Sequence, residues 1–273
     1  IRLSLVGSEM CIRDRYSYGR KRIHCSCCRS LRICGSRSCA PAIRTPRVHN
    51  GGSCRAQSGW GDPGAGHAPP WRCSPRTSFS DIDVERLASH DAVVLALPHG
   101  VSGQIAQELA KTNPDLVIVD AGADFRLSSA SDWCHWYGGD HAGTWAYGLP
   151  ELPRAEGGSQ RDVLSGATRI AGPGCNASAV ALGLAPLIGL VDTSQLAVTL
   201  IVGTSGAGKS SRPDLTFSRM SGGAHPYSVG NAHRHIPEIL QSLRMAGAEE
   251  PHLSVSAVLV PMTRGILAVC TGP

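Results

Sequence analysis

The stretch Ala171-Gly172-Pro173-Gly174-Cys175-Asn176-Ala177-Ser178 decides how this chain is interpreted. Its glycines and proline allow a sharp turn, and the small apolar run 179–191 that follows predicts a helix. Asn and Ser at this point favour a helix start. A cysteine there would face unpaired backbone N–H groups and the helix dipole, which favour a thiolate. From this stretch alone, Cys175 is either a reactive thiol or a small buried side chain.

Charge and cysteine divide the chain of 273 residues into two unlike parts. Residues 1–76 carry 14 Lys and Arg against 3 Asp and Glu, whereas the rest carries 12 against 18. Eight of the 11 cysteines lie at or before Cys73. The later part has the sparse thiols of a cytoplasmic protein, and that is the location we expect. No apolar stretch is long enough to span a membrane, so we expect no membrane association.

Residues 1–78 admit three interpretations. Cysteines among arginines are consistent with a zinc or nucleic-acid-binding module, but no pair of C-x-x-C motifs and no H-x₃₋₅-H supports one. A basic disordered tail is the second, although such tails are usually poor in Cys and Trp. The third is that the segment is not native protein, because Ser4–Arg15 resembles a translated sequencing adapter. We favour the third and expect residues 1–78 to be disordered.

A shift of reading frame accounts for the residues after the adapter. Read one nucleotide later, degenerate codons for His24–Gly35 can spell Ile-Ala-Val-Ala-Val-Gly-Ala-Ser-Gly-Tyr-Ala-Gly. That is a short strand and a G-x-x-G-x-x-G turn, the opening of a dinucleotide-binding βαβ unit. As written, this segment should not form the cofactor loop, so the first βαβ unit is scrambled.

Apolar runs that alternate with helical spacing begin near Phe79 and predict a parallel α/β sheet. Strands are expected at 91–97, 116–120, 169–171, 195–202, 253–260 and 266–270, with helices at 81–90 and 101–111 and from 232. Ligands bind where parallel strands end, which favours Pro98-His99-Gly100 and the stretch 124–126. Arg126 is either a ligand for an anion or a member of a surface ion pair.

The segment Gly203–Ser210 matches the phosphate-loop pattern G-x-x-x-x-G-K-[ST] and follows an expected strand. A phosphate loop needs a helix directly after its Lys-Ser pair. Here Pro213 and a tract rich in Gly and Ser follow. A nucleoside triphosphatase is therefore kept as a minor alternative.

Two histidines open another expected helix. His233 and His235 flank Arg234, and Glu238 follows within a turn. Two imidazoles and a carboxylate are potential metal ligands, but a metal site usually needs further ligands from elsewhere, and we predict no metal. A histidine that acts as general acid or base is at least as consistent with the pattern.

The run from Asp91 to Pro273 resembles the N-acetyl-γ-glutamyl-phosphate reductases, NADPH-dependent enzymes of arginine biosynthesis. The matching segments, in chain order, are 97–100, 123–127, 147–151, 173–175, 205–209, 233–238 and 261–267. The frame-shifted Gly-Ala-Ser-Gly-Tyr-Ala-Gly also matches this family's N-terminus. Asn176 and Ala177 replace an aromatic residue and proline found in many members. Relatives that reduce aminoadipyl phosphate carry the Asn form, so that substrate stays an alternative.

The resemblance implies a mechanism. The Cys175 thiolate would attack the acyl phosphate and form a thioester, which NADPH reduces to the semialdehyde. His233 would transfer the proton, with His235 as second choice. Arg126 would hold the leaving phosphate and Arg264 a substrate carboxylate. The residues expected to contact NADP(H) are Leu97, Pro98, Ser205, Gly206 and Ala207.

The resemblance also implies a domain organisation. Residues 79–174 would complete a Rossmann-like NADP-binding domain, and residues 175–273 would form a mixed α/β catalytic and oligomerisation domain. The second domain is expected to be truncated at its C-terminus. The implied partners are a small acyl phosphate and further copies of the chain, with no nucleic acid.

Overall fold

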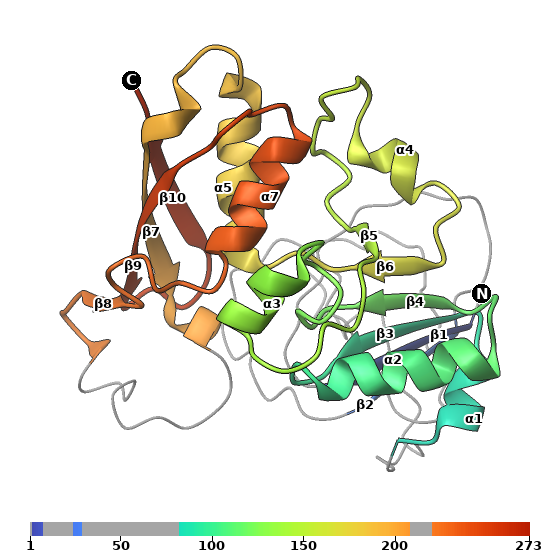
Figure 1. Cartoon of the computed structure of the whole chain (residues 1–273). Helices are drawn as coiled ribbons and strands as arrows, with labels where there is room; N and C mark the ends of the chain where they lie inside the picture. Colours follow the sequence, from blue (N-terminus) through green and yellow to red (C-terminus); the bar gives the residue numbers. More distant parts are fainter. Residues whose placement is uncertain (1, 8–23, 29–81, 208–219) are drawn as a thin grey trace, which may run out of the picture. The chain divides into compact units, whose positions relative to one another are not determined.

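The computed structural model describes residues 2–7, 24–28, 82–207 and 220–273, and the chain divides into two units, Ile1–Gly122 and Ala123–Pro273. Figure 1 shows both units coloured along the sequence. The expected non-native segment 1–78 lies outside the described residues, apart from two short strands. Within the described residues, no helix is both long and apolar enough to cross a bilayer.

The first unit is built on a parallel sheet. Its elements are β1 (Arg2–Gly7), β2 (His24–Cys28), α1 (Val84–Ala88), β3 (Ala92–Ala96), α2 (Val101–Thr112) and β4 (Val117–Asp120). The strand order is β2-β1-β3-β4, and all three pairings are parallel. Strand β3 is an apolar run with Val93, Val94 and Leu95 buried, as expected for a central parallel strand.

The second unit contains the mixed α/β layer. Its helices and strands are α3 (Ala130–Trp136), β5 (Ala146–Tyr147), α4 (Gln160–Leu164), β6 (Arg169–Ala171), α5 (Cys175–Leu184), β7 (Leu196–Gly203), β8 (His225–Tyr227), α7 (Ile236–Met245), β9 (Leu253–Val260) and β10 (Ile266–Thr271). Three 3₁₀ turns join them: η1 (Ala185–Leu187), η2 (Thr193–Gln195) and η3 (Thr204–Ala207). These elements confirm the expected α/β fold.

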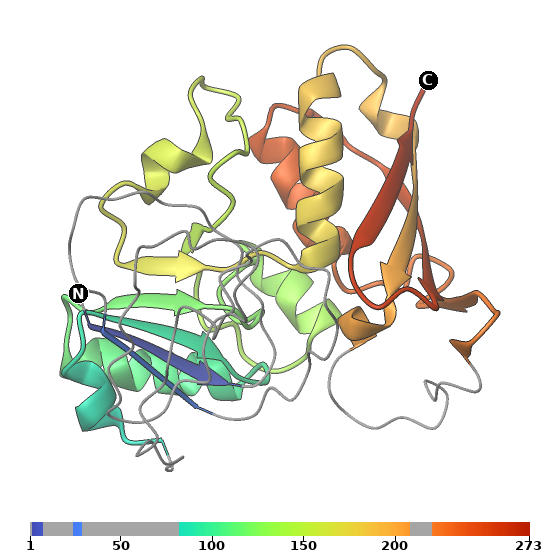
Figure 2. The same cartoon turned by 180° about the vertical axis from the view of Figure 1, so that it is seen from behind.

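A four-stranded sheet and two helices form the core of this unit. The strand order is β10-β7-β9-β8, with β7 parallel to β9 and both edge strands antiparallel to their neighbours. Helices α5 and α7 lie side by side against one face of the sheet (Figure 1), and Figure 2 shows the same arrangement from behind. Alternation along β7 and β9 places Val198, Leu200, Val255 and Ala257 in this core.

Two expected helix boundaries differ from the structure. Helix α5 ends at Leu184 rather than continuing to Val191, because Pro186 follows and Gly189 adopts a φ of +86°, which ends helical geometry. Helix α7 begins at Ile236, after both histidines, with Pro237 in its first turn. The histidines therefore lie just before the helix and not on its surface.

The aromatic residues after Arg126 pack within the second unit. Trp133 is buried and stacks on Tyr137 with ring centroids 4.6 Å apart, and Phe125 stacks on Trp145 at 3.7 Å. Clustered Trp and Tyr side chains either bind a ligand or pack beneath a long loop. The buried, stacked rings support packing.

Candidate active site

The turn before α5 places Cys175 at the first position of the helix. Strand β6 ends at Ala171, and Gly174 is the N-cap in an extended conformation, without a capping side chain. Behind the cysteine, Ala177, Val180 and Ala181 are fully buried and fix the helix on the core. Cys175 itself is an exposed free thiol. The first N–H groups of α5 therefore lie beside an accessible sulfur.

Opposing effects act on that thiol. Desolvation is the largest, and it raises the pKa of Cys175 above 9.0. The backbone N–H of Asn176 and the positive charge of Arg126 lower it, and the charge of Glu238 raises it. The backbone N–H at the helix start therefore lowers the pKa of the thiol, as expected, but desolvation raises that pKa by more.

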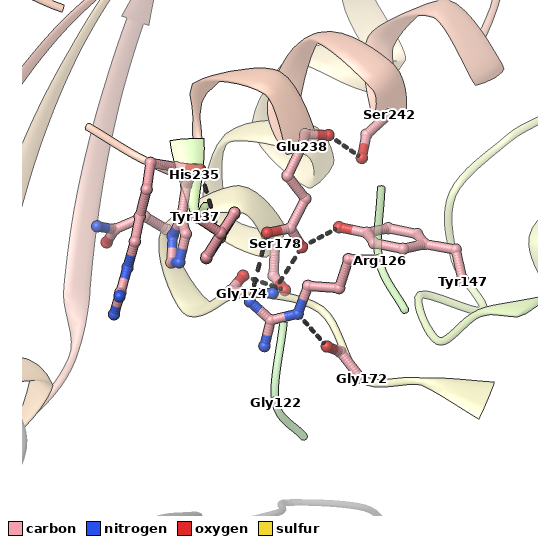
Figure 3. A network of polar contacts seen from close by, with 12 residues as sticks. Gly122, Arg126, Tyr137, Tyr147, Gly172, Gly174, Ser178, His235, Glu238 and Ser242 are labelled. Atoms are coloured by element: carbon pink, nitrogen blue, oxygen red, sulfur yellow. Dashed lines mark hydrogen bonds and ion pairs between the residues drawn. The ribbon is translucent and has the colours of Figure 1, made fainter. Parts of the chain in front are cut away.

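Side chains from three segments hold the Gly-Pro-Gly turn (Figure 3). Arg126 Nε donates to the carbonyl oxygen of Gly172 at 2.7 Å. The N–H of Gly174 donates to Glu238 Oε1 at 2.7 Å, and Tyr147 Oη donates to the same oxygen at 2.8 Å. Arg126 Nη1 lies 3.5 Å from Glu238 Oε2. Arg126 and Glu238 are both buried.

This geometry bears on Arg126, the expected phosphate ligand. Its guanidinium lies among groups of the protein, next to the turn that carries the cysteine. Tyr147 is part of the same arrangement, and burial together with Glu238 raises the pKa of Tyr147 well above 10.0. The phosphate-binding role of Arg126 stays a prediction.

The two histidines lie together and are buried. Their ring centroids are 4.9 Å apart. The N–H of His235 donates to His233 Nδ1 at 3.1 Å, and His233 Nε2 lies 3.0 Å from the side-chain amide of Asn176. That amide also lies 3.3 Å from Tyr227 Oη. His233 is thus joined directly to the residue that follows the cysteine.

These contacts fix the tautomer of His233. Because Nδ1 accepts a hydrogen bond, a neutral ring must carry its proton on Nε2. The structure places Asn176 Nδ2 at 3.0 Å from Nε2, where two donors would face each other. The amide therefore has to be turned so that its oxygen faces Nε2, an orientation that is assigned from such networks. Burial, and secondarily Arg234, lowers the pKa of His233, consistent with a neutral ring.

The His235 ring packs against Gly174 of the turn. A Cβ on Gly174 would stand 2.8 Å from His235 Nε2, so glycine is needed for this close approach. Burial, followed by the charge of Arg126, lowers the pKa of His235 well below 6.5. Its Nδ1 has no hydrogen-bond partner among the described residues. No group of three or more potential metal ligands occurs within those same residues.

The residues expected to bind the cofactor and the substrate carboxylate lie in segments other than the turn before α5. In the second unit, Ser205 N donates to the carbonyl of Thr263, and Gly203 approaches the backbone of Arg264 so closely that a Cβ would stand 2.9 Å from it. The η3 loop and Arg264 are therefore neighbours. In the first unit, Leu97 and Pro98 follow the carboxyl end of β3. The remainder of the phosphate-loop pattern, 208–210, lies outside the described residues.

The sequence did not indicate the contacts that Glu238, Tyr147 and Tyr227 make in this site. A signal for Glu238 was present, because it falls on the face of α7 that buries Ile239 and Ser242. A carboxylate at a core position of an amphipathic helix indicates a specific partner. Tyr227 lies in a tract rich in Gly and Ser, which carries no such signal.

Comparisons with known proteins identify the family of the chain. Residues 64–158 match the family model described as semialdehyde dehydrogenase, NAD binding domain, and residues 175–273 match semialdehyde dehydrogenase, dimerisation domain. The N-acetyl-gamma-glutamyl-phosphate reductase of Leifsonia xyli is 53% identical over 213 residues, which are 77% of this chain and 60% of that protein. The enzyme of that name from Micrococcus luteus is 48% identical over 195 residues, 71% of this chain and 55% of that one.

A solved structure shows the same fold. Aspartate semialdehyde dehydrogenase from Francisella tularensis superposes with a TM-score of 0.50 at 14% identity, over 71% of this chain and 61% of that one. The chain spans 55–60% of the length of the two curated relatives above.

Proposed function

Because the chain belongs to the semialdehyde dehydrogenase family, we propose that it reduces N-acetyl-γ-glutamyl phosphate to N-acetylglutamate semialdehyde and phosphate. The observation that carries this proposal is Cys175 at the start of α5 with His233 and His235 beside its turn. The names of the curated relatives supply the substrate. They also favour the glutamyl over the aminoadipyl compound.

Cys175 is the proposed nucleophile. Its sulfur attacks the acyl carbon, the C–S bond forms, and the C–O bond to phosphate breaks, leaving a thioester. Because desolvation raises the pKa of this thiol, a base has to take its proton at neutral pH. The N–H groups at the start of α5 face the developing charge.

The two histidines are the proposed proton-transfer groups. His233 is our first choice, as the donor of the proton that it holds at Nε2 next to Asn176, because its Nδ1 already accepts from the His235 N–H. His235 has a free Nδ1 among the described residues and lies against Gly174, which makes it the second. Both rings have lowered pKa values because they are buried, so both start neutral.

Two arginines are proposed to bind the anionic parts of the substrate. Arg126, which binds the Gly172 carbonyl of the turn, would attract the leaving phosphate. Arg264 would hold the substrate carboxylate, next to the Ser205 loop. Guanidinium groups bind both anions through paired hydrogen bonds.

NADP(H) is the proposed cofactor, and it supplies the hydride that reduces the thioester carbon. The first unit fits a dinucleotide, because β3 pairs parallel with β4 and Pro98-His99-Gly100 are exposed where β3 ends. Leu97 and Pro98 would lie along the dinucleotide. Ser205, Gly206 and Ala207 would contact its nicotinamide end through backbone groups. The preference for NADPH over NADH is part of the proposal.

The phosphate-loop pattern has another explanation in this structure. Gly203 is required where β7 meets the backbone of Arg264, at the close approach described above. A glycine that serves backbone packing does not need a nucleotide to explain it. The nucleoside triphosphatase alternative therefore loses its main support.

Domain organisation, assembly and location complete the proposal. We place the domain boundary between residues 174 and 175, where the dimerisation-domain match begins. We keep 1–78 as non-native, although the NAD-binding match already begins at residue 64. The chain would form homo-oligomers through the second domain. Cys134, Cys175 and Cys270 are free thiols, which supports a reducing, cytoplasmic location.

The decisive test replaces the nucleophile. We expect Cys175→Ala to lower phosphate-dependent oxidation of N-acetylglutamate semialdehyde by on the order of a thousandfold or more, because no other group takes over covalent attack. The absorbance of the NADPH that forms provides the rate. Cys134→Ala removes another exposed thiol and should retain wild-type turnover. Substantial turnover by Cys175→Ala would rule out the nucleophile assignment.

A further inference from the structure

We infer that Glu238 is a positioning residue that clamps the Gly172–Gly174 turn and thereby fixes the start of α5 around Cys175. The inference deepens the proposed function, and it rests on that function only for the role of Cys175 as nucleophile. Glu238 is not proposed to contact substrate or cofactor. It acts through its hydrogen bond with the turn.

Glu238 is fully buried, and both of its oxygens have partners. Oε1 accepts from the Gly174 N–H at 2.7 Å and from Tyr147 Oη at 2.8 Å. Oε2 lies 3.5 Å from Arg126 Nη1. The Glu238 carboxylate on α7 therefore links Tyr147 of β5 and Arg126, which follows β4, to the backbone N–H of Gly174.

The turn is held at both ends by this ion pair. Arg126 Nε binds the carbonyl of Gly172, and Glu238 binds the N–H of Gly174. The carbonyl of Gly174 accepts from the N–H of Ser178 at 2.8 Å, as the first bond of α5. Because these bonds fix both peptide planes that flank Pro173, they also fix the direction in which the helix leaves the turn (Figure 3).

Stability alone does not explain this arrangement. Desolvating a carboxylate and a guanidinium costs more than their attraction usually returns, and a buried apolar pair is often at least as stable. Hydrogen bonds from an N–H to a carboxylate are, however, stronger and shorter than neutral ones. A buried carboxylate that binds the peptide just before the nucleophile suits a role in position rather than in overall stability.

The pair also sets the charge next to the sulfur. Arg126 lowers the pKa of Cys175, and Glu238 raises it. Removing the negative charge while keeping an oxygen at Oε1 should therefore leave the thiol more acidic. A residue whose charge did not act on the sulfur would not move this titration.

The test is Glu238→Gln, with the reactivity of Cys175 as the readout. Iodoacetamide alkylation is followed on the tryptic peptide 170–209, whose single cysteine is Cys175. A fall of one unit in the thiol pKa raises the thiolate fraction about tenfold below that pKa, and we expect an increase of about threefold or more at pH 7.5. Gln160→Leu is the matched control, because it removes another buried polar side chain of the second unit, bonded to Arg154.

Tyr147→Phe tests the clamp if Glu238→Gln does not fold. It keeps both charges and removes one donor to Oε1, so we expect amide hydrogen exchange in residues 172–176 to accelerate about two- to tenfold. Neither measurement requires turnover, so an inactive wild-type chain would count against the reductase proposal alone. A folded Glu238→Gln variant with the wild-type alkylation profile would overturn the inference, as would unchanged exchange in Tyr147→Phe.

Discussion

At the scale of single residues, Asn176 is the link between the nucleophile and its neighbouring histidine. Its amide lies 3.0 Å from His233 Nε2, and the His235 N–H occupies the other ring nitrogen. These two contacts favour a neutral ring with its proton on Nε2. Protonation would place a second proton on Nδ1, against the N–H of His235.

Asn176→Asp should therefore change the titration of His233. A carboxylate beside Nε2 favours the imidazolium, so we expect the pKa of His233 to rise by about one unit or more. Histidine ring signals followed by NMR between pH 5 and about 8 provide the measurement, a range that covers ordinary histidine titration. Asn113→Asp makes the same change of charge in the first unit and should leave the His233 signal in place. An unchanged titration in Asn176→Asp would contradict the assigned contact.

Single residues also show what the sequence could and could not predict. Cys175 was identifiable because turn residues and a helical run flank it in the chain. The partners of its turn come from positions 126, 147 and 238, which only the fold brings together. Residue type made Arg126 a good anion ligand, yet the sequence could not indicate that a buried carboxylate lies 3.5 Å from it.

At the scale of elements, the start of α5 depends on a residue without a side chain. Gly174 has an ordinary φ of −67°, so its conformation does not require glycine. The space around it does, because a Cβ would stand 2.7 Å from His235 Cε1 and 2.8 Å from Glu238 Oε2. The helix start, the histidine and the carboxylate are thus packed in contact.

Gly174→Ala should destabilise the second unit by about 1–3 kcal/mol, the usual cost of overpacking a filled site. The Cys175 alkylation rate should change with it, since the clashing groups border the turn. Gly183→Ala lies in the same helix, where the nearest atom to a new Cβ is Cys270 Sγ at 3.8 Å. That control should gain about 0.5–1 kcal/mol from helix propensity. Urea unfolding measures both, and equal effects of the two substitutions would argue against the close approach.

Elements were predictable where one physical signal dominated. Buried parallel strands are continuous apolar runs, which is why β3 and β4 were expected near their observed bounds. Strands β7 and β9 alternate buried and exposed residues, and they too were expected near their bounds. Strand pairing was not predictable in the same way. Strands β9 and β10 are consecutive in the chain, yet β10 pairs with β7, and β7 separates it from β9. Local sequence does not encode which edge a strand occupies.

At the scale of the whole molecule, no helix among the described residues of the second unit covers one face of its four-stranded sheet. Helices α5 and α7 pack against the other face. Register places the exposed side chains of three strands in rows on the open face: Ala197, Thr199, Ser254, Ser256, Leu267, Val269 and Thr271. None of these side chains is charged, and depletion of charge is typical of the centre of an interface. This face is the surface through which we propose that copies of the chain associate.

Val269→Glu should convert the assembly to monomers. Val269 lies on β10 with 46% of its surface exposed, so a carboxylate costs little in the monomer but is desolvated in an interface. Light scattering after size exclusion should give a multiple of 28.6 kDa for the wild type and a single chain mass for the variant. Leu190→Glu is the matched control, because Leu190 is 79% exposed and lies in the turn after η1, away from the sheet. It should retain the wild-type mass, since only a charge placed on the open face has to lose its water when two chains meet. A Val269→Glu variant that keeps the wild-type mass would remove this face as the site of association.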